Sequence, residues 1–159
     1  RTAKFPPAEL SVSIAIPVHH KHRSLNTTGH FHVLVTNTSQ TPQNVWSEKY
    51  SWGYFNLSFE VTDEQGNTTV VRKKQREWSK NFPDFLTLAP GESYVLDVNL
   101  YGERADSVWE NIPAGPQRGS QPRIIKMRAV YQSAPDEESK RLNVWTGSVA
   151  SPSDEYAIW

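Results

Sequence analysis

Apolar and polar residues alternate with a period of two along much of this chain, and residues 85–100 show the pattern most clearly. A short apolar run at 85–88 precedes the turn sequence Ala89-Pro90-Gly91-Glu92, in which Pro presets φ and Gly is free to adopt a positive φ. After the turn, apolar residues occupy every second position: Tyr94, Leu96, Val98 and Leu100. This alternation is typical of a strand with one buried face. The stretch therefore predicts a β-hairpin, and we expect a second sheet to cover its apolar side, because two strands alone are unstable in water.

Several other segments carry the same period, and none carries a helical one. Alternating or apolar runs separated by turn residues occur at 10–16, 30–36, 55–62, 68–74, 125–131, 142–149 and 155–159. Many short strands between turn signals predict an all-β fold, an antiparallel β-sandwich of about eight or nine strands. Without an internal repeat or a low-complexity linker, residues 1–159 are expected to form a single domain. Residues 1–8 are expected to be an extended arm, since Pro6-Pro7 prevents a helix.

Composition excludes several classes of function. Seventeen basic residues balance seventeen acidic ones, which argues against a nucleic-acid partner. No run approaches the length of apolar residues that a membrane-spanning helix needs, and the absence of cysteine excludes disulfides and thiolate chemistry. The chain has no G-x-S-x-G, H-E-x-x-H or phosphate-binding glycine motif, so we expect no enzyme activity.

Three motifs resemble those of a known class of proteins. These are LTLAPGESYVLDVNL at 86–100, RAVYQS at 128–133 and NVWTGSVAS at 143–151, and LVTNTS at 34–39 follows a fourth pattern of the class. Together they resemble uncharacterised exported bacterial Ig-like β-sandwich proteins, in which a PGE hairpin precedes strands reading R-A-x-Y and W-T-G-x-V-x-S. The resemblance extends from about residue 10 to residue 158 and implies a single Ig-like sandwich located in the periplasm or outside the cell after removal of a signal peptide. Its motifs describe a fold and imply no catalytic residue.

All five histidines fall between positions 19 and 32. His30 and His32 are two residues apart on an expected strand, so their imidazoles project from one face, which is the outer face if Phe31 and Val33 are buried. His20 and His22 share the spacing, and a returning hairpin would bring them opposite. Four neutral imidazoles, with His19 as a possible fifth, would suit Cu²⁺ or Zn²⁺, although a solvated basic loop explains the same composition.

Aromatic residues offer a second candidate surface. Trp46, Tyr50 and Trp52 lie in a segment without a clean period and are candidates for a sugar-stacking platform or a partner surface, whereas Trp109 and Trp145 are expected in the core. A basic run at 72–80 brackets Trp78, and lysines that protect an edge strand explain it better than nucleic-acid binding does.

These observations lead to one main expectation about function. The motifs describe a fold and contain no catalytic residue, and a sandwich of short strands has many exposed strand edges. Both features favour a non-catalytic Ig-like interaction or structural module of an exported bacterial protein, with a protein partner in a larger assembly. Transition-metal binding by the histidines and carbohydrate binding by the tryptophans are the alternatives. No resident cofactor is expected apart from that Cu or Zn site.

Overall fold

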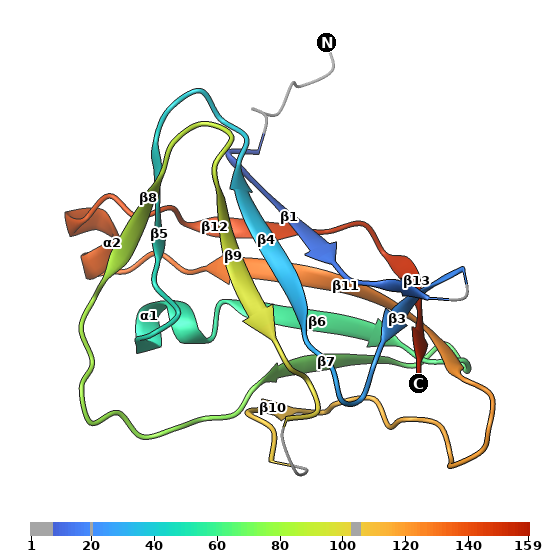
Figure 1. Cartoon of the computed structure of the whole chain (residues 1–159). Coiled ribbons are helices and arrows are strands. Elements are labelled where there is room, and N and C mark those ends of the chain that lie inside the picture. Colours follow the sequence, from blue (N-terminus) through green and yellow to red (C-terminus); the bar gives the residue numbers. More distant parts are fainter. Residues whose placement is uncertain (1–7, 20, 103–105) are drawn as a thin grey trace.

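The chain folds as an all-β structure of sheets packed face to face, as the alternation predicts (Figure 1). The computed structural model describes residues 8–19, 21–102 and 106–159. Within these residues the chain forms thirteen strands and two short helices. Neither helix is long enough to cross a membrane.

Three sheets contain these strands. The first has the order β1-β4-β9 and consists of β1 (Leu10–Ala15), β4 (Phe31–Asn37) and β9 (Ser93–Val98). The large sheet has the order β10-β7-β6-β11-β13-β3-β2, with β12 paired to β11 beside this path. Its strands are β2 (Val18–His19), β3 (His22–Leu25), β6 (Leu57–Thr62), β7 (Thr68–Lys73), β10 (Trp109–Glu110), β11 (Arg123–Ser133), β12 (Gly147–Ala150) and β13 (Asp154–Ile158). A two-stranded ribbon is formed by β5 (Gln43–Trp46) and β8 (Phe85–Leu88).

The hydrophobic core lies between the small sheet and the large one, whose strands cross behind it in Figure 1. Alternate residues of β4, Phe31, Val33 and Val35, are at most 3% exposed, whereas the His32 side chain between them is 51% exposed. Phe31 meets Phe59 of β6 edge to face across the layers, with ring centroids 5.7 Å apart. The inward residues of β4 therefore anchor the sheet, and its alternate residues are free for an outward role.

Residues 85–100 do not form the hairpin that their sequence predicts. β8 pairs with β5, and β9 pairs with β4, so the two strands joined by the PGE turn belong to different sheets. The buried side chain of Asn37 links the end of β4 to the end of β8, since its Nδ2 donates to the carbonyl oxygen of Leu88 at 2.9 Å. The Gly91 N–H in turn donates to the Asn37 carbonyl at 2.8 Å. The turn reverses the chain as expected, but the second strand finds its partner elsewhere.

Smaller differences concern segments without a clean period. The aromatic segment after residue 45 contains the end of β5 and helix α1 (Ser51–Tyr54), neither of which the sequence pattern predicts. The charged stretch before residue 142 contains helix α2 (Glu137–Arg141), begun by a capping box in which Asp136 and Ser139 bond reciprocally. The strand expected at 142–149 starts only at Gly147. A helix of one turn is too short to display a helical period.

Candidate interaction site

A polar cluster occupies the outer face of the small sheet where β4 begins and β9 ends. His32 lies opposite Asp97 in the strand register. The Asp97 carboxylate bridges the two histidines, with Oδ2 2.9 Å from Nδ1 of His30 and Oδ1 3.4 Å from Nε2 of His32. The outward projection of both imidazoles from one face is as the sequence predicts.

Hydrogen bonds determine which tautomer of neutral His30 fits this cluster. The Gly102 N–H donates to Oδ1 of Asn99 at 3.1 Å, which orients the Asn99 amide so that Nδ2 faces Nε2 of His30 at 3.3 Å. Nε2 therefore accepts a hydrogen bond, and Nδ1 donates its proton to Asp97. Both ring nitrogens have protein partners, so a metal ion would have to displace one of them.

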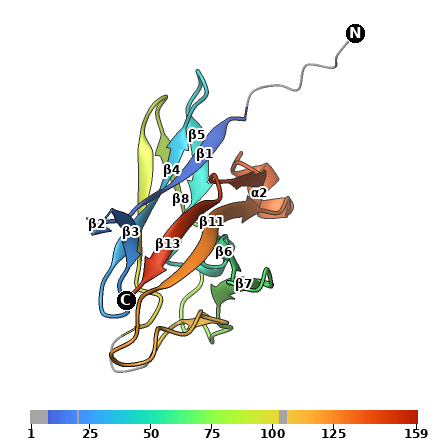
Figure 2. The ribbon, with the colours of Figure 1, turned by 90° about the vertical axis from the view of Figure 1, so that its right-hand side faces the viewer.

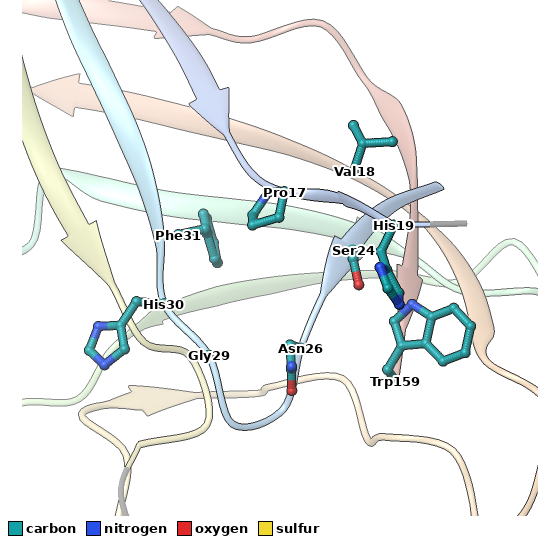
Figure 3. Close-up of a pocket in the computed structure, with 9 residues that line it drawn as sticks. All are labelled: Pro17, Val18, His19, Ser24, Asn26, Gly29, His30, Phe31 and Trp159. Carbon is teal, nitrogen blue, oxygen red and sulfur yellow. The ribbon is translucent and has the colours of Figure 1, made fainter. Parts of the chain in front are cut away.

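Two further histidines lie in a short hairpin, His19 in β2 and His22 in β3. His19 and His22 are directly opposite in its register. Figure 3 shows His19 beside Trp159, with ring centroids 6.1 Å apart, at a hollow of about 440 Å³, while the His30 ring points away from both. His20 lies outside the described residues. Among the residues that are described, no three His, Asp or Glu side chains are placed to bind one metal ion. The four-histidine site stays a prediction.

The predicted aromatic platform is divided between core and surface. Trp46 is only 2% exposed and packs against Trp52, with ring centroids 6.1 Å apart, so it belongs to the core. Tyr50 is half-buried and meets the exposed Phe82 edge to face. Of these three residues, Tyr50 and Trp52 are left for a platform. Trp109 and Trp145 are buried, as expected.

A hollow of about 390 Å³ opens beside the C-terminal end of β9, where Asp97 and Asn99 form part of its wall. We call it the β9 hollow. It lies between this edge of the small sheet and the end of β7 in the large sheet, and its other principal residues are Glu48, Lys49, Tyr54, Lys73, Arg76 and Trp109. The sequence pattern gave no indication of this hollow, because its residues come from several separate parts of the chain.

Lys73 is the most unusual group in the β9 hollow. Its side chain is 10% exposed, and its Nζ lies 3.6 Å from the Glu48 carboxylate, too far for a strong hydrogen bond. The Nζ also lies over the Tyr54 ring at 4.2 Å and the Trp109 ring at 5.5 Å. Desolvation lowers the pKa of Lys73 below its ordinary value, and Glu48 offsets this only in part. An ammonium group is thus held at the wall of a hollow with incomplete compensation.

The edge of β9 that faces away from β4 has no partner strand among the described residues. Val95 in the middle of this strand is 53% exposed and so places an apolar side chain on the outer face beside the unpaired edge. The other edge of the sheet, β1, presents only small outward side chains: Ser11, Ser13 and Ala15. The two open edges therefore differ in what they offer a ligand.

Comparisons with known proteins assign no family to the chain. No family model matches the sequence, and a search of curated proteins finds no relative. Function must therefore be inferred from the geometry of β9 and its surroundings.

Proposed function

We propose that this chain is a non-catalytic, Ig-like interaction module of an exported bacterial protein, and that it binds a protein partner by adding a strand of that partner to β9. The observation that carries the proposal is the unpaired edge of β9. An extended segment that pairs with such an edge gains main-chain hydrogen bonds, while its side chains find specificity in neighbouring surface features.

Two features favour β9 over the opposite edge. Val95 gives the partner an exposed apolar contact in mid-strand, and the β9 hollow gives it a recess at the strand end. The edge of β1 offers neither. Proteins generally protect unpaired edges with charged side chains, bulges or covering loops. The edge strand β9 instead has an exposed valine, Val95, at its middle.

A photo-crosslinking amino acid placed at position 95 tests this proposal in material from the producing cells. We expect one partner to be captured at close to one copy per chain, and Val95→Lys to abolish its co-purification because a lysine there opposes strand addition. The matched control is the same probe at Ser13, and Ser13→Lys, on β1. A chain that is monomeric without a partner, or equal capture at positions 95 and 13, would contradict the proposal.

The transition-metal and carbohydrate alternatives remain open to direct tests. Calorimetry with Cu²⁺ and Zn²⁺, on the wild type and a His30→Ala/His32→Ala double variant, decides the first. Retention on insoluble polysaccharide, lost with Trp52→Ala, decides the second.

A further inference from the structure

Three basic side chains line the β9 hollow, and two of them have no ion-pair partner among the described residues. Two basic residues of β7 are paired: Arg72 with Glu110 at 2.8 Å, and Lys73 with Glu48 at the longer distance of 3.6 Å. Lys49 and Arg76, which also line the hollow, form no ion pair within the described part of the chain. The hollow therefore has an excess of unpaired positive charge.

The two carboxylates of the hollow, Glu48 and Asp97, offset two of its three cations, Lys49, Lys73 and Arg76, which leaves a formal excess of one positive charge. The Asp97 carboxylate is engaged by His30 and His32 on the outer face of the sheet. Glu48 is the single carboxylate that approaches Lys73 within the described residues. A second carboxylate at the Lys73 ammonium would supply the acceptor that Glu48, at its present distance, does not.

The aromatic rings of the hollow indicate which kind of acidic ligand fits. Sugars bind proteins largely through a free aromatic face, but here the faces are covered by cations. Of the two rings that line the hollow, Tyr54 has Lys73 over it at 4.2 Å and Arg76 at 5.4 Å, and Trp109 has Lys73 over it at 5.5 Å. Arg76 also stacks over Trp78, outside the lining, at 4.3 Å. The same stacking holds the guanidinium in place for bidentate contact with a carboxylate. An acidic side chain of a peptide is therefore a better occupant than a sugar ring.

We infer that the segment added to β9 is acidic, and that an Asp or Glu side chain near its end enters the β9 hollow beside Lys73 and Arg76. This inference rests on the proposed strand addition at β9 and specifies the chemistry of the partner. The extended backbone pairs with β9, an apolar side chain contacts Val95, and the carboxylate reaches the cations where Asp97 and Asn99 line the wall.

Selection from a displayed library of random linear peptides, carried out on the full chain, tests this inference. We expect the selected peptides to share one acidic position. Changing that residue to Gln, or changing the protein at Lys73→Met or Arg76→Gln, should weaken binding about tenfold, the usual scale for a lost charge pair at an interface. Lys126→Met, at an exposed lysine of β11 remote from the hollow, is the matched control and should leave affinity unchanged.

The possible outcomes separate the two proposals. Selected peptides that depend on Val95 but show no acidic preference, and that tolerate Lys73→Met, would overturn the acidic partner and leave strand addition standing. Failure to select any peptide that is sensitive to Val95→Lys would overturn both. Binding of polygalacturonate in a Lys73-dependent manner, without peptide binding, would overturn the peptide in favour of an acidic polysaccharide.

Discussion

Lys73 carries a charged ammonium group in a mostly buried environment that suits an apolar side chain. The long methylene stem and the ammonium are mostly buried against Tyr54 and Trp109, and the one carboxylate partner is 3.6 Å away. Buried ion pairs often contribute little to stability, because desolvation offsets their attraction. We therefore assign Lys73 to binding, because its ammonium lies at the wall of the β9 hollow, and not to stability.

Replacing this lysine should therefore not weaken the fold. We expect Lys73→Met to leave the free energy of unfolding unchanged or to raise it by about 1–2 kcal/mol near neutral pH, since Met fills similar volume and Glu48 remains partly solvated. The pKa of Lys73 in the folded state lies below the unfolded value of 10.5. As the pH rises towards 10.5, the folded state therefore binds fewer protons than the unfolded state. The free energy of unfolding of the wild type therefore rises relative to that of the variant across this pH range.

Chemical denaturation of both proteins at a series of pH values measures this difference, and groups that titrate equally in the two proteins cancel. Lys126→Met is again the control. A loss of more than about 2 kcal/mol in Lys73→Met would mean that the lysine is a structural element, contrary to its assignment to binding.

The motif residues that suggest a family resemblance serve packing. Tyr131, from RAVYQS, stacks on Trp145, from NVWTGSVAS, with ring centroids 6.0 Å apart. Gly147 approaches that same Trp145 ring so closely that an added Cβ would lie 3.0 Å from it. These two motifs thus mark places where strands pack, whereas the motif at residues 86–100 contains β9 itself.

At the scale of elements, the alternation of residues identifies strands but not their partners. The buried face of β4 and the outward direction of His30 and His32 follow from period two alone. The pairing of β8 with β5 depends on long-range contacts such as that of Asn37 with Leu88, fifty-one residues apart. For the same reason the sequence revealed the histidine pair but not Asp97, Asn99 or the β9 hollow, which tertiary structure brings together.

The Asn37 side chain stabilises the point where the chain passes from the β5–β8 ribbon to β9 in the small sheet. Its Nδ2 donates to the carbonyls of Leu88 and Thr41, and its Oδ1 accepts from the Ser39 N–H and hydroxyl. Asn37→Ala would remove the side-chain donor to the buried Leu88 carbonyl and leave a space at a fully buried position, and we expect it to reduce the free energy of unfolding by about 2–4 kcal/mol. Denaturant titration measures the loss.

The control is Gln40→Ala, an exposed position in the same loop, which should change stability by less than about 0.5 kcal/mol. If both variants are equally stable, strand pairing alone stabilises the passage of the chain from β8 to β9, and the Asn37 side chain does not contribute.

At the scale of the molecule, the β9 hollow lies on one side of the sandwich, where residues of both sheets line it. Figure 2 shows the layers from the side, with the small sheet and the large sheet facing each other. The edge of β9 and the end of β7 border this side, and the β9 hollow lies between them. An added strand at β9 would extend the small sheet over the hollow, which joins main-chain pairing and charge recognition in one surface.

Amide hydrogen exchange of the chain, with and without a selected acidic peptide, tests this account most directly. Strand addition predicts that amides of β9 which do not pair with β4 exchange at least about tenfold more slowly in the complex, while amides of β1 are unaffected. Bound peptide that leaves β9 exchange unchanged, or that protects β1 instead, would contradict the assignment of β9 as the binding edge.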